Sequence, residues 1–333
     1  MRSLVLLVAV VSALAACTTA EGSDATLPEP TTTTTTSTTT TVVVTLPEGR
    51  VDLDEAGEAL VVPAGSAVPL GEVTASGVLI RSAASPEPVG GADFVTDRFR
   101  VRVERGVTYT ESVVAGGTRA LRLDVYSPRD DERTDRPGFI AIHGGGFVGG
   151  ARSGGPQATV CRDLASRGHV CASIEYRLVR DDVPGEGPVL PRTIGAAVED
   201  ATAAVEWMRT NADALGVDPG RISIGGSSAG AITALLTAFT VEGIDLHRVV
   251  DLWGGMYDEV DAIGSDGPPV LIVHGVQDRT VSFLLAEQLM DELSVEGVPF
   301  VAYPFAERAH GVPLDSEVDG ERLLDLIAEF VGS

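Results

Sequence analysis

The chain has 333 residues, of which 44% are hydrophobic and 38 are glycine, so it suits a globular α/β protein and is not disordered throughout. Its 48 acidic residues outnumber 24 basic residues, all of them arginine, and the formal net charge is −24. That charge argues against a basic surface for nucleic acid or for anionic membranes, so we expect no nucleic-acid partner.

A signal peptide is predicted over residues 1–16. An apolar run from Leu4 to Val11 follows Arg2 and is too short to span a bilayer as a stable helix. The segment from Leu14 to Cys17 resembles the bacterial lipobox, which implies cleavage before Cys17 and attachment of lipid to its sulfur. The alternative is an ordinary signal peptide with an incidental cysteine. We therefore expect an exported protein, anchored by lipid alone to the outer face of the bacterial cytoplasmic membrane or cell envelope.

Residues 17–48 form the predicted linker. The tract from Thr31 to Thr41, broken only by Ser37, cannot bury apolar surface, so we expect a disordered spacer. Residues 49–97 mix valine, proline, glycine and acidic residues without a helical period. They are either an extension of the spacer or a flap packed over the domain that follows.

The predicted catalytic domain spans residues 98–333. Alternating or short apolar runs predict strands at Val101–Val103, Val107–Tyr109, Ala120–Tyr126, Gly138–Ile142, Val170–Ile174, Arg221–Ile224, Val249–Trp253, Pro269–Val273 and Phe300–Tyr303. Helical spacing predicts helices at Ala158–Arg167, Thr193–Asn211, Ala231–Phe239, Phe283–Leu293 and Gly320–Phe330. Strands that alternate with helices predict an α/β fold with a doubly wound, mostly parallel sheet, antiparallel at the edge that the first strands form.

Two cysteines of this domain, Cys161 and Cys171, are predicted on a helix and on the strand that follows it. Disulfides form in exported proteins, so these two residues are candidates for a pair. The alternative is two buried thiols, and the sequence leaves both open.

A candidate nucleophile lies in Gly226-Ser227-Ser228-Ala229-Gly230, between a predicted strand and a predicted helix. This pattern matches the nucleophile elbow, in which a serine occupies a strained turn and flanking glycines avoid collisions with neighbouring backbone. Ser227 is excluded as the nucleophile because its frame would need glycine at Ala229. We therefore predict Ser228.

The serine needs a base and an acid that orients the base. His310 follows the last predicted strand, where the chain order Ser, Asp, His of this motif places the base. Asp278 follows the preceding strand and is the predicted acid, with Asp258, one strand earlier, as the reserve candidate.

An oxyanion site is predicted in the loop His143-Gly144-Gly145-Gly146-Phe147, which follows a buried strand. Consecutive glycines let backbone N–H groups approach a substrate oxygen, and the amide of Ala229 would complete the site.

The other histidines receive structural interpretations. We expect His143 to brace the glycine loop, His274 to be structural, and His169 and His247 to lie in loops or at the surface. No histidine cluster has metal-ligand spacing and no phosphate-binding glycine motif occurs, so we expect no metal and no cofactor.

From residue 100 to 331 the chain resembles the α/β-hydrolase carboxylesterases, especially the hormone-sensitive-lipase-like branch. The resemblance rests on motifs in the same order: Leu123–Pro128, His143–Phe147, Glu175–Leu178, Asp200, Gly216–Ile222, the elbow, and His310-Gly311. It implies the roles of nucleophile, acid, base and oxyanion donors for Ser228, Asp278, His310 and the group Gly145, Gly146 and Ala229.

The chain departs from that branch in three places. Ser227 stands where an acidic residue is usual, Ala231 where a second glycine is usual, and the segment before Asp278 also resembles the HGxxD form of dienelactone-hydrolase and peptidase relatives. The connection from Trp253 to Pro269 is too short for a large helical lid.

These observations predict a carboxylesterase-type serine hydrolase that cleaves small-molecule esters through an acyl-enzyme. The alternatives are an acyltransferase or a peptidase on the same triad, or a non-catalytic surface binding protein.

Overall fold

The computed structural model describes five short strands between residues 51 and 81, the turn at 94–96, and residues 99–333. Cys17, the predicted signal peptide and the threonine-rich linker lie outside the described residues. The short strands are β1 (Val51–Leu53), β2 (Ala59–Val61), β3 (Val73–Thr74), β4 (Gly77–Val78) and β5 (Ile80–Arg81). β1 pairs with β2 and β3 pairs with β4, both antiparallel, whereas β5 joins the main sheet beside β13.

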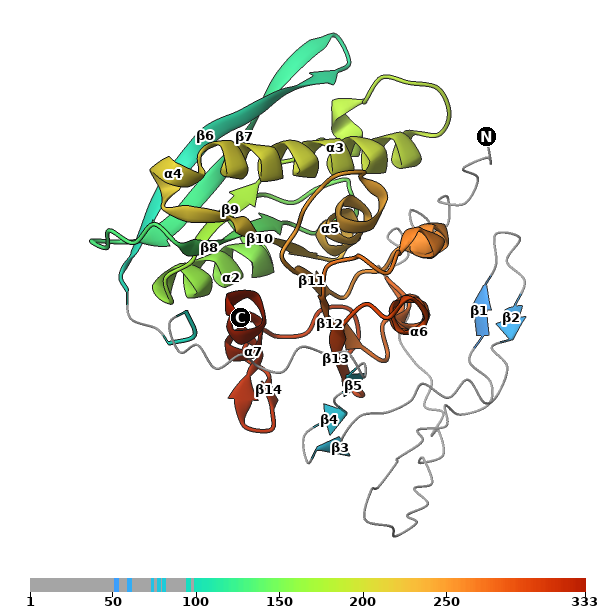
Figure 1. The fold of residues 1–333 in the computed structure, drawn as a ribbon. Coiled ribbons are helices and arrows are strands. Elements are labelled where there is room, and N and C mark those ends of the chain that lie inside the picture. Colours follow the sequence, from blue (N-terminus) through green and yellow to red (C-terminus); the bar gives the residue numbers. More distant parts are fainter. Residues whose placement is uncertain are drawn as a thin grey trace, which may run out of the picture.

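The main sheet has nine strands in the order β5-β13-β12-β11-β10-β8-β9-β7-β6 (Figure 1). Its remaining members are β6 (Val101–Val114), β7 (Gly117–Pro128), β8 (Arg136–Ile142), β9 (Val170–Ile174), β10 (Val217–Ser227), β11 (Val249–Leu252), β12 (Val270–Gly275) and β13 (Phe300–Phe305). The six strands from β8 to β13 run parallel, while β6, β7 and β5 are antiparallel at the two edges. The prediction of a doubly wound, mostly parallel sheet with an antiparallel edge is confirmed.

Helices cover both faces of this sheet (Figure 1). On one face lie α3 (Val189–Thr210), α5 (Ala229–Thr240) and α6 (Phe283–Glu296), and on the other lie α2 (Gly155–Ser166) and α7 (Leu323–Gly332). Short turns are η1 (Val179–Asp181), α4 (Ala212–Leu215) and η2 (Tyr257–Ala262). No helix in the described part of the chain is long and apolar enough to cross a membrane.

The central strands are apolar along their length because both of their faces are covered. Every residue of β8 is buried. Since side chains alternate along a strand, Phe139 and Ala141 enter the core beneath α2 and α7, whereas Ile140 and Ile142 enter the core beneath α3, α5 and α6.

Several predicted boundaries differ from the structure: α2, α3 and β10 begin three or four residues earlier than predicted, and two differences have a clear local cause. The two short strands expected at Val101–Val103 and Val107–Tyr109 are one strand, β6, with a register shift at Gly106, whose φ is 72°. The last helix begins at Leu323 and not at Gly320, because Gly320 turns the hairpin of β14 (Glu317–Val318) and β15 (Glu321–Arg322).

The order of the strands decides where a site can form. β9 pairs with one side of β8 and β10 pairs with the other, so the chain reverses its direction of winding between β8 and β10. Such a reversal leaves a crevice at the carboxyl ends of the strands. Gly226 near the end of β10 lies opposite Ile142 at the end of β8, so the loops that follow these strands meet there.

Candidate active site

Ser228 stands at the sharp turn between β10 and α5. Its φ of 54° and ψ of −122° lie outside the ordinary regions for a residue with a side chain, and its N–H donates to the Leu252 carbonyl at 2.9 Å. A Cβ on Gly226 would lie 2.5 Å from the backbone of Gly230, and a Cβ on Gly230 would lie 2.1 Å from the Ile142 oxygen. Both glycines are therefore required by the close approach of β8 to the elbow.

The glycine loop after β8 lies directly against the elbow. A Cβ on Gly144 would lie 2.7 Å from the Ser227 oxygen and 3.2 Å from the Ser228 Cβ. Gly145 has φ of 122°, and its carbonyl accepts hydrogen bonds from the two backbone N–H groups at residues 148 and 149, both at 3.1 Å. The wall of the cavity at Ser228 includes the predicted oxyanion residues Gly145, Gly146 and Ala229.

His143 and Tyr176 support the glycine loop through hydrogen bonds and a ring contact. The Nδ1 atom of His143 lies 2.8 Å from the Gly144 oxygen, and its ring stacks on Tyr176 at 4.4 Å between centroids. The Tyr176 hydroxyl donates to the His143 carbonyl at 2.8 Å. Burial lowers the pKa of His143, so the ring is neutral near pH 7 and braces the loop through the hydrogen bond at Nδ1.

Three predicted residues from three separate loops meet in this crevice. His310 Nε2 lies 2.9 Å from Ser228 Oγ, and His310 Nδ1 lies 2.6 Å from Asp278 Oδ2. The other carboxylate oxygen, Oδ1, accepts from the N–H groups of Thr280 at 2.8 Å and Val281 at 3.0 Å. The serine, the imidazole and the carboxylate thus form a continuous hydrogen-bonded row.

Asp278 is the buried end of this row, with 1% of its surface exposed. Burial alone would raise its pKa, but the hydrogen bonds from His274 and His310 outweigh burial and hold the pKa well below its usual range. The carboxyl group is therefore ionised throughout the neutral range. The reserve candidate, Asp258, is exposed in η2.

The loop that carries His310 is held by close backbone contact with the end of β12. A Cβ on Gly275 would lie 2.3 Å from the Ala309 oxygen, so only glycine fits there. The Gln277 N–H donates to the Arg308 carbonyl at 2.9 Å. These contacts bring the His310 loop against the turn that carries Asp278.

A cavity of about 680 Å³ opens at Ser228 and His310. Its walls include large apolar side chains from several elements: Phe147, Leu190, Ile232, Trp253 and Val281. Among the described residues that line it there is no aspartate, glutamate or arginine. The cavity has the size of a small-molecule pocket and offers no formal charge to pair with a charged substrate group.

Several residues that line this cavity have unfavourable backbone angles. Phe147, Trp253 and Tyr257 have φ values of 63°, 52° and 50°, and all three line the cavity together with Ser228. Non-glycine residues adopt this region rarely and at a cost, which is typical of functional sites. Burial and the nearby Asp278 raise the pKa of Tyr257 to about 12, so its phenol stays neutral.

The connection that could carry a lid is short. Between β11 and β12 the chain forms only the 3₁₀ turn η2, from Tyr257 to Ala262. The expectation that this connection is too short for a large helical lid is confirmed.

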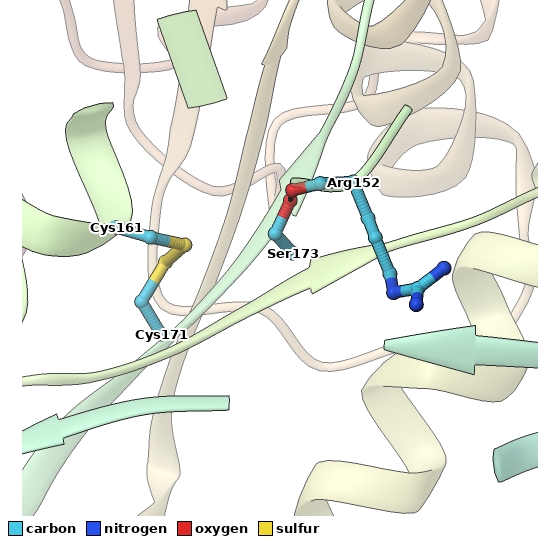
Figure 2. Close-up of a disulfide and its surroundings, with 4 residues drawn as sticks. All are labelled: Arg152, Cys161, Cys171 and Ser173. Carbon is cyan, nitrogen blue, oxygen red and sulfur yellow. Dashed lines mark hydrogen bonds between the residues drawn. A yellow bond between two sulfur atoms is a disulfide. The ribbon is translucent and has the colours of Figure 1, made fainter. Parts of the chain in front are cut away.

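Cys161 and Cys171 are joined by a disulfide that links α2 to β9, with 5.1 Å between their Cα atoms (Figure 2). Further along β9, the Ser173 hydroxyl donates to the carbonyl of Arg152 at 2.7 Å. The Arg152 Nε atom donates to Asp124 Oδ1 at 2.8 Å. Arg152 directly follows Ala151 in the cavity wall, so β9 fixes part of that wall.

The sequence interpretation singled out neither the buried Asp251 nor the burial of His169. His274, expected to be structural, is buried, and its Nε2 lies 3.4 Å from Asp278 Oδ2. His169 lies in a loop but not at the surface: it is fully buried and its Nε2 lies 3.0 Å from the Phe94 carbonyl oxygen. Burial lowers the pKa of His169 to about 3. His247, also in a loop, is half-buried.

Comparison with known proteins gives three related findings. The BD-FAE family model matches residues 123–252, which is less than half of the chain. Esterase LipC of Mycobacterium tuberculosis (strain ATCC 25618 / H37Rv) is 31% identical over 159 residues, 48% of this chain and 36% of that protein. A probable isoprenylcysteine alpha-carbonyl methylesterase, ICMEL1, of Oryza sativa subsp. japonica is 39% identical over 127 residues, 38% of this chain and 27% of that protein. The chain thus spans about a third of the length of these curated relatives.

Solved structures extend the likeness to most of the described chain. Esterase 2 of Thermogutta terrifontis, phosphoramylated by tabun, superposes with a TM-score of 0.57 at 23% identity and covers 74% of this chain and 95% of that chain. A truncated carbohydrate esterase from gut microbiota has a TM-score of 0.54 at 17% identity and covers 71% and 96%. Together with the strand order and the crevice described above, these likenesses establish that the protein has the α/β-hydrolase fold.

Proposed function

We propose that the protein is a carboxylesterase that hydrolyses small, uncharged esters at Ser228. The observation that carries the proposal is the hydrogen-bonded row of Ser228, His310 and Asp278, because Ser228 and His310 line a cavity whose wall includes a glycine loop. The relatives named esterase and methylesterase support the choice of an ester as the substrate.

In the first half of the reaction, Ser228 Oγ attacks the carbonyl carbon of the ester while His310 Nε2 takes the hydroxyl proton. The negative charge that develops on the carbonyl oxygen is stabilised by backbone N–H groups of Gly145, Gly146 and Ala229. His310 then gives its proton to the alcohol oxygen, the carbon–oxygen bond breaks, and the acyl group stays on Ser228.

In the second half, water replaces the alcohol. His310 takes a proton from the water, the hydroxide attacks the acyl carbon, and the same N–H groups stabilise the second oxyanion. The Ser228 oxygen leaves with the proton that His310 returns, which releases the acid and restores the enzyme. Asp278 stays ionised and stabilises the imidazolium in both halves.

Hydrolysis of a series of p-nitrophenyl esters tests this proposal. We expect turnover by the wild type and a loss of about 10⁴-fold or more in kcat for Ser228→Ala, because the nucleophile is removed. The matched control is Ser223→Ala on the same strand: Ser223 is fully buried and its Oγ has no hydrogen-bond partner among the described residues, so activity is retained. A wild type that hydrolyses none of the esters, or a Ser228→Ala variant that keeps its rate, would contradict the proposal.

We also propose that the domain is exported and anchored by lipid at Cys17, a proposal that rests on the sequence from Leu14 to Cys17. Radiolabelled palmitate supplied to a bacterial host that expresses the full chain would be incorporated by the wild type and not by Cys17→Ala. Equal incorporation by the two chains would contradict lipid attachment at this cysteine.

A further inference from the structure

A second histidine contacts the carboxylate that orients His310. His274, near the end of β12, places its Nε2 2.9 Å from the Val281 carbonyl oxygen and 3.4 Å from Asp278 Oδ2. His310 contacts the same oxygen at 2.6 Å, so two imidazoles share one carboxylate oxygen. A carbonyl oxygen only accepts hydrogen bonds, so Nε2 of His274 carries a hydrogen, and the state of its Nδ1 decides whether the ring is charged.

A buried carboxylate faces His274 from the neighbouring strand. Asp251 on β11 lies opposite Ile272 on β12, and Ile272 shares a face of the sheet with His274 because the two are two residues apart. The Asp251 side chain is fully buried, and its Oδ1 accepts from the Gly254 N–H at 2.7 Å. Within the described part of the chain, Asp251 Oδ2 and His274 Nδ1 each lack a hydrogen-bond partner.

The charges around His274 favour an imidazolium. Burial acts to lower the pKa of His274, but the hydrogen bond to Asp278 and the charge of Asp251 outweigh burial and raise it. Burial raises the pKa of Asp251 to about 6, against the opposing effect of His274. Around neutral pH both carboxyl groups are therefore ionised, and a neutral His274 would leave Asp251 as an uncompensated buried charge, an arrangement that is strongly destabilising.

The other elements packed here, among those that the structure describes, add no competing charge to His274. The ring of Phe283 on α6 meets the His274 ring edge-on, with 5.7 Å between centroids. On the side of α5, Ala231 closes the space next to Gly254 and Asp251. The neutral phenol of Tyr257 in η2 faces Asp278. Among the described residues, the titratable groups that face His274 are thus Asp251 and Asp278. Through Asp278, His274 acts on His310.

We propose that His274 is a positioning residue: as a cation between Asp251 and Asp278, it fixes Asp278 against His310 and offsets part of the carboxylate charge that His310 experiences. The role of His310 in this statement rests on the proposed function. The cation reduces the net negative charge beside the base, so its removal should move the acid limb of the labelling rate to higher pH. Asp251 in turn keeps His274 charged.

The first test is the rate at which a fluorophosphonate labels the protein as a function of pH, compared between wild type and His274→Gln. Glutamine keeps a donor for the Val281 carbonyl but carries no charge. We expect the midpoint of the acid limb to move up by about one pH unit, because a positive charge close to Asp278 is lost. An acid limb that stays in place would overturn the proposal, since a merely structural histidine would change the rate and not the midpoint.

The control for that test is His247→Gln. His247 is half-buried just before the start of β11, at the opposite end of the parallel strands from Ser228, and its Nε2 contacts the Ser333 oxygen at 2.8 Å. We expect its acid limb to coincide with that of the wild type. If His247→Gln shifted the limb as far as His274→Gln, the shift would not be specific to the Asp251–His274–Asp278 group and the proposal would fail.

The second test needs neither turnover nor a folded His274 variant. Nitrogen-15 NMR of the wild-type imidazole rings reports directly whether both nitrogens of His274 carry hydrogen. We expect an imidazolium at pH 7, and a fall in the midpoint of its titration in Asp251→Asn. A neutral His274 at pH 7 in the wild type would overturn the proposal. Absence of ester hydrolysis with a charged His274 would instead count against the proposed function alone.

Discussion

At the scale of single residues, the site depends on glycines at which a side chain would collide with neighbouring atoms. Gly226 and Gly230 face each other and β8 at the elbow, and Gly144 faces Ser227 and Ser228. A Ser228 φ of 54° is held only by such surroundings. The glycine loop and the elbow are therefore one packed unit, and a change in one displaces the other.

Gly144→Ala tests this unit. The new Cβ would lie 2.7 Å from the Ser227 oxygen, so the loop must shift by a few tenths of an ångström or more. We expect kcat/KM for a neutral ester to fall by about 100-fold, because the proposed oxyanion donors, once displaced, would no longer match the transition state.

The matched control is Gly149→Ala in the same loop, where a Cβ would meet no atom within 4 Å and φ is not in the left-handed region. We expect its kcat/KM to stay within about twofold of the wild type. Equal losses in Gly144→Ala and Gly149→Ala would show that general loosening of the loop, and not collision with the elbow, sets the rate.

The three residues of the hydrogen-bonded row could be predicted from the sequence because order along the chain and position after a strand are local signals. Ser228, Asp278 and His310 each follow a strand, and parallel strands end at one edge of the sheet. His274 and Asp251 were not predicted as part of the site. Each is a polar residue near the end of an apolar strand, and only the register of β11 on β12 places them on one face.

At the scale of elements, the buried strands were easier to predict than the edges. β9 spans Val170–Ile174 as predicted, because its residues are all apolar or small and all buried. β6 is an edge strand with mostly exposed or half-buried residues, so its apolar pattern is weak and Gly106 interrupts it. A strand that is buried on both faces is apolar along its whole length, so its sequence pattern is clear. An exposed edge strand has no such requirement, so its pattern is weak.

The hairpin before α7 did carry a local signal that was overlooked. Asp319 and Gly320 have φ values of 55° and 84°, and an Asp-Gly pair with both residues at positive φ is typical of a two-residue hairpin turn. The residues of β14 and β15 are charged and exposed apart from Val318, so no alternating apolar pattern marks them as strands. The helical spacing of apolar residues in α7 was therefore extended back to Gly320.

The disulfide between Cys161 and Cys171 links α2 covalently to β9, and we expect it to stabilise both elements. Cys161→Ala combined with Cys171→Ala should lower the free energy of unfolding by about 3 kcal/mol, because a loop of this length gains freedom in the unfolded chain. Both sites are fully buried, so a small cavity adds to the loss. Urea denaturation measures the change.

The control for that experiment is reduction. A reductant should lower the stability of the wild type and leave the double variant unchanged. Alkylation of Cys161 and Cys171 in unfolded, unreduced wild type would show two free thiols and contradict the disulfide.

At the scale of the whole molecule, the net charge of the chain and the apolar lining of the cavity both disfavour anionic ligands. The chain carries a formal charge of −24, and the described lining of the cavity includes no arginine to pair with an anion. A long-range negative potential repels anionic substrates during approach, and an apolar wall penalises a charge once it is bound. On the proposed function, we therefore expect neutral esters as substrates.

This argument predicts a difference between two esters of similar size. We expect kcat/KM for a butyrate ester to exceed that for a hemisuccinate ester by about 100-fold or more, because the hemisuccinate buries an unpaired carboxylate. Raising sodium chloride from about 20 to 500 mM should increase the hemisuccinate rate several-fold by screening and leave the butyrate rate unchanged. Equal rates for both esters at low salt would contradict the account.

The most direct measurement is the site of covalent modification by a fluorophosphonate, mapped by mass spectrometry of the digested protein. We predict one phosphonyl group per chain on the peptide that contains Ser228, no adduct in Ser228→Ala, and labelling slowed at least about 100-fold in His310→Ala, because the base that activates the serine is lost. An adduct on another residue, or labelling of Ser228→Ala at the rate of the wild type, would contradict the assignment of Ser228 as the nucleophile.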